Sequence, residues 1–451
     1  MSLTVALNTA VSGLFANQNA IAATSENIAN VNTENFARRE ARFVTDAIPG
    51  QFAGVSVDIT RAGVNRFLQS AGYASASDAG ATSVVADAIA HVEASLGAPG
   101  ENLSFANKLD EAFAALTQLS AAPSSVAAKA VAVNALDAAF GAGNRTLGAI
   151  DGEITAADAR LQTQTARANI LLEEIFNLNQ IVSDSNGAGD EIDARLTELS
   201  SLIDINVTRA DDGRVTVATS SGQLLANAGG YAALGFTGGA AASISLSTVD
   251  PVSGAQSLVS ANFNGDITDG EIGGLVALRN IELPALRQIV ENAMRGVATE
   301  LNNVYAGNAS VGVSAPVTTP LIVETGGAFF VNQAILGDPA QFAAARPTGG
   351  APGGANDGSG AAALAAIANS GAASNVATAV TQIGAAARIA SDASATAASF
   401  ASEIETRILS EGGVNLDEEL SNLILFQRAY NANARVIAAV DELYQSLLNI
   451  L

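Results

Sequence analysis

Apolar residues recur every seven positions at the start of the chain. The spacing is held by Leu7, Leu14, Ile21 and Ile28, and small or polar residues lie three or four positions away from each. This pattern lines one face of a helix and is typical of a coiled-coil seam. Because Gly13 and repeated asparagines lower helix propensity, we expect this helix to need a partner surface.

The end of the chain carries a matching stripe. Its members are Leu416, Leu420, Leu423, Tyr430, Ile437, Tyr444 and Leu448. A helix over residues 416–451 has a length of roughly 50 Å at 1.5 Å per residue. Acidic residues at 417–419 favour the positive end of its dipole. We predict that the terminal helices pair as a coiled-coil domain, with these stripe residues as the assembly interface. Asp441 falls on the same stripe, and we expect it to turn toward water.

The middle of the chain reads as helical over long stretches. Residues 75–185 are rich in alanine with helical periodicity, and Pro-containing breaks at 98–100 and 122–124 indicate stacked helices with short loops. The same periodicity predicts helices over 270–304 and 361–410.

The periodicity changes to two near residue 203. Ile205 and Val207, then Val215 and Val217, alternate about the turn at 211–213, which predicts a hairpin within a small β region. The predicted fold is mostly α with a β insertion. We expect few contacts across the borders of the β region. The predicted domains are a terminal coiled coil of 1–40 with 412–451, a mainly helical middle domain of 41–202 with 264–411, and a small outer β domain of 203–263.

Composition excludes several classes of function. No apolar run approaches the roughly 20 residues needed to cross a bilayer, so we expect no membrane insertion. The net charge is −23, whereas nucleic-acid binding needs basic patches, so we expect no nucleic-acid partner. The chain has no cysteine and one histidine, which excludes thiolate nucleophiles and two-histidine metal sites. We expect no cofactor, no metal and no enzymatic activity.

Three features that resemble reactive sites have simpler interpretations. The Gly-rich segment 349–360 lacks the lysine of a phosphate-binding loop and indicates a flexible loop. The spacing of Asp266, Asp269 and Glu271 fails the calcium-loop pattern and indicates a solvated turn. His91 has no identifiable nucleophile near it in the sequence and is expected to be an ordinary helix residue.

A basic triplet, Arg38, Arg39 and Arg42, follows the first helix, in which there is no lysine or arginine. Its position is compatible with an acidic neighbour elsewhere in the fold or with a solvated turn, and the sequence favours neither.

Both ends of the chain resemble a known family. The segments Ser-Gly-Leu-Phe-Ala at 12–16 and Asn-Ile-Ala-Asn-Val-Asn-Thr-Glu-Asn-Phe at 27–36 are similar to the N-terminal motif of bacterial flagellar rod, hook and hook-associated proteins. The segments Gly-Val-Asn-Leu-Asp-Glu-Glu at 413–419 and Gln-Arg-Ala-Tyr at 427–430 resemble the matching C-terminal motif. The form of the ending is most similar to the hook-associated members found at the hook–filament junction.

The resemblance implies an extracellular structural subunit, an adaptor ring that joins hook to filament. In this family the terminal helices form an inner tube, and export through the flagellar type III apparatus uses no cleaved signal. Residues 1–37 accordingly lack the basic region of a signal peptide. The implied partners are identical subunits in a ring, the hook protein, the next hook-associated protein, and a cytosolic export chaperone at the C-terminal helix.

Two alternatives stay open. A rod or hook subunit shares the N-terminal motif, although the form of the C-terminal motif and the long helical middle favour the junction. A secreted carbohydrate-binding protein would use the β region at 203–263, but the chain has no tryptophan to form a binding platform.

Overall fold

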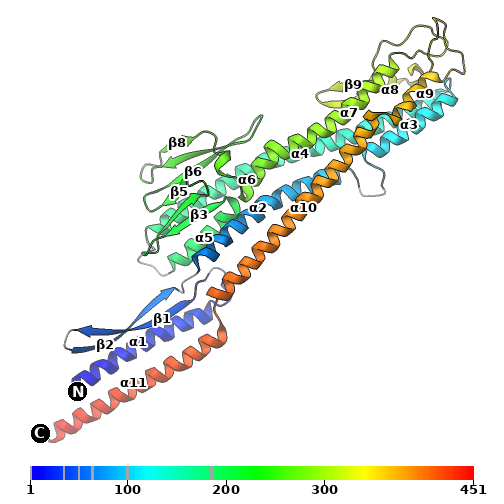
Figure 1. The fold of residues 1–451 in the computed structure, drawn as a ribbon. Coiled ribbons are helices and arrows are strands. Elements are labelled where there is room, and N and C mark those ends of the chain that lie inside the picture. Colours follow the sequence, from blue (N-terminus) through cyan, green and yellow to red (C-terminus); the bar gives the residue numbers. More distant parts are fainter. Residues whose placement is uncertain are drawn as a thin grey trace.

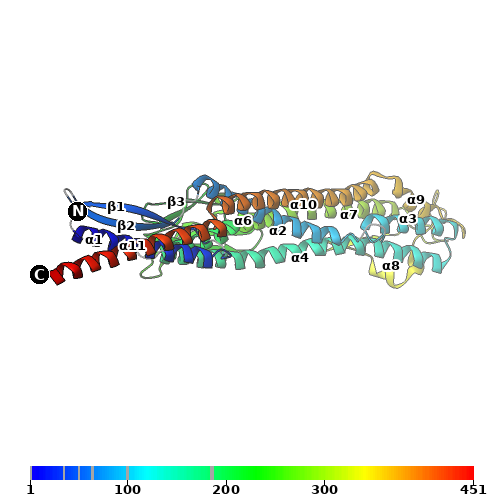
Figure 2. The same cartoon turned by 90° about the horizontal axis from the view of Figure 1, so that it is seen from below.

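Long alanine-rich helices lie side by side and give the molecule an elongated body (Figures 1 and 2). The computed structural model describes residues 3–33, 36–48, 51–61, 65–97, 101–182 and 187–450. The body helices are α2 (Arg66–Ala94), α3 (Phe105–Ala121), α4 (Val126–Asn179), α5 (Ala188–Leu202), α6 (Gly270–Ala277), α7 (Leu283–Tyr305), α8 (Gln333–Gly337), α9 (Ser359–Ala365) and α10 (Gly371–Gly412).

Several of these helices begin where the sequence supplies a capping side chain. Ser104, Ser125 and Ser370 each accept a hydrogen bond from a backbone N–H in the first turn of α3, α4 and α10, which satisfies a donor that has no partner inside the helix. The predicted break at 122–124 separates α3 from α4, and the one at 98–100 lies outside the described residues. The helix predicted over 361–410 is two helices, α9 and α10, joined through the 3-10 turn η4 (Ala366–Asn369).

The helix α4 is the axis of the core. Its side chains Leu136, Phe140, Leu161 and Leu172 are fully buried against neighbouring helices and strands. In the described part of the chain, α4 is also the one helix long and apolar enough to cross a membrane, but much of its apolar surface is already covered inside the protein. Its hydropathy is therefore that of a core helix.

A six-stranded antiparallel sheet lies against α4 on one side of the body (Figure 1). Its strands pair in sequence order: β3 (Ile205–Arg209), β4 (Val215–Thr219), β5 (Leu224–Asn227), β6 (Gly230–Thr237), β7 (Ser243–Val249) and β8 (Gln256–Ser260). The expected β region is present, but the expectation of few contacts across its borders is wrong. Val217, Leu225 and Leu234 belong to the same hydrophobic core as α4.

Shorter elements complete the body. The 3-10 turn η1 (Asn264–Asp266) leads from the sheet into α6, and a π-helical turn, η2 (Leu278–Glu282), joins α6 to α7. A two-stranded antiparallel sheet of β9 (Ile322–Thr325) and β10 (Ala328–Val331) follows α7 along the chain. The 3-10 turn η3 (Pro339–Gln341) follows α8.

A second hairpin, β1 (Arg39–Ile48) with β2 (Gln51–Arg61), is a correction to the predicted domains. We assigned residues from 41 onward to a mainly helical domain, yet this segment is an antiparallel hairpin that lies on the first helix. The signal was present, because Val55, Val57 and Ile59 alternate with polar residues over 55–60.

Asparagine side chains attach strands to helices through the strand backbone. In α4, the amide of Asn169 donates to the carbonyl of Leu234 at 2.8 Å, and its oxygen accepts from the N–H of the same residue at 2.7 Å. One amide therefore supplies both hydrogen bonds that an adjacent strand would make. The same two-way pairing joins Asn179 to Val215, Asn144 to Phe329, and Asn302 to Ile322.

We expect Asn179→Ala to lower the free energy of unfolding by about 1–3 kcal/mol, because it leaves the buried N–H and carbonyl of Val215 without partners. Urea denaturation followed by circular dichroism measures the loss. Asn177→Ala, an exposed position two residues earlier on the same helix, is the control and should change stability by less than about 0.5 kcal/mol. Equal effects of the two substitutions would contradict this role for Asn179.

Candidate assembly site at the paired termini

The two ends of the chain lie alongside each other at one end of the body (Figures 1 and 2). The N-terminal helix α1 (Leu3–Ala29) packs on the C-terminal helix α11 (Leu416–Ile450), and the β1–β2 hairpin packs on α1. The buried residues of α1 are mostly small: Ala10, Gly13, Ala16, Asn17, Ala20, Ala23, Thr24 and Asn27. Small side chains let the backbone of α1 come close to its neighbours.

Close approach is visible at Gly13. A Cβ atom at this position would lie 2.9 Å from Nδ2 of Asn433 on α11, so a larger residue here would displace that amide. Near the chain ends, the Thr4 hydroxyl and the Tyr444 hydroxyl are 3.0 Å apart and share a hydrogen bond. The seam between the helices is therefore narrow and partly polar.

The residues predicted for the interface occupy three kinds of position. Leu7, Leu14, Ile21 and Ile28 on α1 are half-buried, beside the small-residue face rather than in its centre. Half-buried positions on α11 are Leu423, Tyr430, Ile437 and Tyr444, whereas exposed ones are Leu416, Leu420 and Leu448. Asp441 is exposed and lines, together with Leu7, Ile437 and Tyr444, a groove of about 290 Å³ between the helices.

The sequence motifs of the two ends meet at Asn27. This residue is fully buried, accepts a hydrogen bond from the N–H of Arg39 at 2.7 Å and donates to the carbonyl of Arg39 at 2.9 Å. Its amide nitrogen also donates to Oε2 of Glu419 at 3.1 Å. A single asparagine thus joins α1, β1 and α11, which gives a physical reason for asparagine at this motif position.

Arg38 completes the contact with α11. Its Nε donates to Oε1 of Glu419 at 2.7 Å and its Nη2 to Oε1 of Glu418 at 2.6 Å. Burial lowers the pKa of Arg38, but the hydrogen bonds to the two carboxylates outweigh it, so the pKa lies above its usual value. Asn415 caps the start of α11 by accepting from the N–H of Asp417 at 3.0 Å, which holds these carboxylates in the first turn.

The structure shows the surroundings of the three arginines of the basic triplet. Arg38 and Arg39 both meet acidic neighbours, as one of the two interpretations expected, and Arg42 is exposed. The sequence did not identify which acids they meet, because Glu419 and Asp190 are far away along the chain.

The hairpin supplies contacts that the sequence analysis missed. Phe43 of β1 stacks obliquely on Phe426 of α11, with ring centroids 5.7 Å apart. The hydroxyl oxygen of Ser12 on α1 accepts a hydrogen bond from the N–H of Val55 on β2 at 3.1 Å. The unit formed by α1, α11 and the hairpin is called the terminal unit below.

Uncovered apolar side chains occur along α11 and are spread around it, since Leu420 and Leu425, five residues apart, lie about 140° apart around a helix of 3.6 residues per turn. They are Leu416, Leu420, Ile424, Leu425, Val436, Leu443 and Leu448, each at least 44% exposed. A soluble monomer seldom exposes so many large apolar residues on one helix, and such surfaces usually mark contact with another molecule.

The other candidates have structural surroundings of an ordinary kind. His91 is largely exposed, and its Nδ1 lies 3.1 Å from Glu153 on α4. Glu271 accepts from Nε2 of Gln164 at 2.7 Å. In the loop at 349–360, Gly358 lies directly against the Ser120 carbonyl, where a Cβ atom would not fit. Within the described ranges, no three acidic or histidine side chains gather into a group able to hold a metal ion.

Comparison with known proteins matches three regions of the chain. Residues 89–312 match the flagellar hook-associated protein FlgK helical domain, residues 407–450 the flagellar basal body rod FlgEFG protein C-terminal family, and residues 7–36 the flagella basal body rod protein family. Flagellar hook-associated protein 1 of Escherichia coli is 40% identical over 58 residues, and that of Salmonella typhimurium is 41% identical over 58 residues. Each alignment spans 13% of this chain and only 11% and 10% of the respective relative.

A solved structure extends the likeness to the fold. The flagellar hook junction protein FlgK from Burkholderia pseudomallei superposes with a TM-score of 0.62 at 14% identity, covering 76% of this chain and 99% of that one. Paired terminal helices with rod-protein motifs, on either side of a helical domain of this type, define an axial protein of the bacterial flagellum. Within that class, the chain is similar to flagellar hook-associated protein 1, FlgK, through the helical-domain match over 89–312 and the short matches to the curated relatives.

Glu419→Gln should weaken the attachment of α11 to α1 by about 1.5–3 kcal/mol. Glutamine replaces one of the two accepting oxygens by an NH2 group, so either Asn27 or Arg38 loses its acceptor. Hydrogen exchange at the amides of the first turns of α11 measures the change. The control, Glu418→Gln, makes the same substitution at the neighbouring residue, whose side chain is 55% exposed, and should have a smaller effect. A larger effect at Glu418 would place the principal contact elsewhere.

Proposed function

We propose that the chain is a structural subunit of the bacterial flagellum that forms an adaptor ring between hook and filament. It acts by packing of its terminal helices within and between subunits, and not by catalysis. The observation that carries the proposal is the meeting of the two terminal motifs at Asn27 and Glu419, on a helix that carries seven large and uncovered apolar side chains.

The uncovered apolar side chains of α11 suit contact with further subunits. Apolar surface at this density is stabilised when a neighbouring helix covers it, at about 25 cal/mol per Å² of area removed from water. Its proposed occupants in the assembled flagellum are identical subunits in a ring, the hook protein and the next hook-associated protein. Of the stripe residues predicted from the sequence, the uncovered Leu416, Leu420 and Leu448 are proposed to contact other subunits, and the half-buried members are proposed to pack within the subunit.

The same uncovered side chains of α11 suit binding to a cytosolic export chaperone before assembly. An amphipathic helix binds well in an apolar groove, which would protect the exposed leucines until the subunit leaves the cell. The proposed destination is the extracellular hook–filament junction, reached by export without a cleaved signal peptide.

The domain assignment is likewise a proposal. It consists of a terminal domain of 1–40 with 412–451, a middle domain of 41–202 with 264–411, and an outer β domain of 203–263. Because the β1–β2 hairpin packs on α1, we move residues 41–61 into the terminal domain.

A rod or hook subunit is the second candidate, and one observation favours it. The family matches at both ends of the chain, 7–36 and 407–450, are to basal-body rod families. The helical-domain match over 89–312 favours the junction instead.

Leu425→Asp should abolish filament formation without lowering the stability of the subunit, since this side chain is 59% exposed in the isolated chain. Secretion into the medium, thermal unfolding and electron microscopy of hook tips together test the substitution. Asn431→Asp adds the same charge at another exposed position of α11 and should leave filaments intact. Normal filaments with Leu425→Asp would contradict an assembly role for the uncovered apolar side chains of α11.

Ile437→Asp should also prevent junction assembly, because it replaces a half-buried apolar side chain of the groove between α1 and α11 by a second carboxylate, one turn from that of Asp441, and the two like charges repel. Asp441→Asn, one turn further along, changes an exposed residue and should be mild. Swimming assays with an immunoblot for secreted subunit compare the two, and the reverse order of severity would overturn the assignment of the helix faces.

A further inference from the structure

The terminal unit is joined to the body by few contacts. Among described residues, no element of the terminal unit shares an extensive packing surface with an element of the body. Covalently, α10 ends at Gly412 and α11 begins at Leu416, so a short segment that includes Gly413 connects them. Packing alone therefore does little to fix the direction of the terminal unit.

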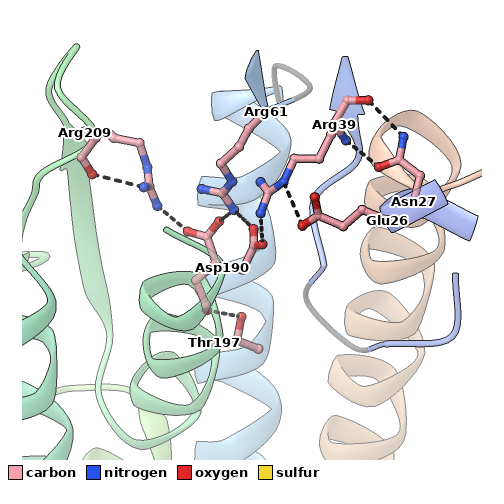
Figure 3. A network of polar contacts seen from close by, with 9 residues as sticks. Glu26, Asn27, Arg39, Arg61, Asp190, Thr197 and Arg209 are labelled. Atoms are coloured by element: carbon pink, nitrogen blue, oxygen red, sulfur yellow. Dashed lines mark hydrogen bonds and ion pairs between the residues drawn. The ribbon is translucent and has the colours of Figure 1, made fainter. Parts of the chain in front are cut away.

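Ion pairs bridge this gap. Arg39, in the first position of β1, and Arg61, in the last position of β2, lie opposite each other in the hairpin register. Both reach Asp190 of α5: Nη2 of Arg39 lies 2.6 Å from Oδ2, and Nη2 of Arg61 lies 2.6 Å from Oδ1 (Figure 3). One carboxylate of the body therefore holds both strands of the hairpin.

The ion pairs continue in both directions. Arg61 also contacts Oδ2 of Asp193 at 2.6 Å, and the other oxygen of Asp193 accepts from Arg209 on β3. At the opposite end, Glu26 of α1 lies 3.7 Å from Nε of Arg39. The result is a row of alternating charges from α1 to the sheet, here called the charge ladder: Glu26, Arg39, Asp190, Arg61, Asp193 and Arg209, of which all but Asp193 are labelled in Figure 3.

Neighbouring residues accommodate the side chains of the charge ladder. The side chain of Arg39 is only 3% exposed, and its guanidinium lies 5.3 Å from the centroid of the Phe36 ring. Gly189 makes room for Arg61, because a Cβ atom there would lie 2.7 Å from its Nη1. Asp190 lies in the first turn of α5, where the helix dipole favours a carboxylate.

The two carboxylates stabilise the charged form of Arg61. Burial lowers the pKa of Arg61, but the charges of Asp193 and Asp190 and their hydrogen bonds outweigh it, so the pKa lies above its usual value. The ladder has three arginines and three carboxylates and is neutral as a whole, in a chain with 21 basic and 44 acidic residues. Three of the few cations are thus gathered at one joint.

We propose that Asp190 and Asp193 are positioning residues that set the direction of the terminal unit relative to the helical body and the sheet. Asp190 pairs with both arginines of the hairpin, and Asp193 pairs with Arg61 of the hairpin and Arg209 of the sheet. The direction is therefore fixed by charge pairing across a joint with little packing. This inference concerns the isolated subunit and does not depend on the proposed function.

The test measures a distance across the joint. Because the chain has no cysteine, Gln18→Cys on α1 and Gln162→Cys on α4 provide two unique and exposed sites for nitroxide labels. Double electron–electron resonance on the full chain should give one narrow distance distribution. Asp190→Asn with Asp193→Asn should broaden it at least about twofold, while circular dichroism shows unchanged helix content.

Three comparisons separate positioning from general stability. Glu291→Gln removes a carboxylate paired with Arg287 and Arg295, all within α7, and should leave the distribution narrow. Asp190→Glu keeps the charge and should broaden the distribution less than Asp190→Asn. If the double variant unfolds, Arg61→Gln removes the arginine shared by both carboxylates and should broaden it. A narrow, unshifted distribution in a folded double variant or in Arg61→Gln would overturn the proposal.

Discussion

A strand that meets a helix instead of another strand leaves its backbone groups without partners, and much of this fold depends on how that need is met. Asparagine amides of helices supply both missing hydrogen bonds, at Asn169 for the sheet and at Asn144 for the small hairpin. Asn27 does the same for β1 and extends the pairing to Glu419 of α11. The interaction that attaches strands to the body therefore also joins the two ends of the chain.

Helix periodicity and the change to alternation near residue 203 were sufficient to predict the mostly helical body and the β insertion, because both patterns are local. The sequence also predicted the pairing of the terminal helices, although not that the buried face of α1 consists mostly of small residues such as Ala16 and Ala20. Periodicity analysis weights large apolar residues, and close packing of alanine leaves a weaker signal. The hairpin over Arg39–Arg61 was overlooked, since its alternation is confined to one strand.

Long-range polar partners were beyond prediction for a different reason. Arg38 and Glu419 are 381 positions apart, and nothing in the composition distinguishes this carboxylate from the other acidic residues. In a chain so poor in cations, however, a cluster of arginines is itself informative. Where positive charge is scarce, its location indicates where separate parts of the fold are joined.

The seam of α1 has a mechanical consequence. Alanine and glycine form shallow knobs, so rotating or sliding one helix past the other displaces little volume and meets low barriers. The contacts of Asn27 and Arg38 with Glu419, by contrast, are directional and anchor the pair at the end next to the body. The helices are therefore held at both ends, by these contacts next to the body and by the hydrogen bond between the Thr4 and Tyr444 hydroxyls near the chain ends. Between these two points, the small residues of α1 offer little steric resistance to slight adjustments of one helix against the other.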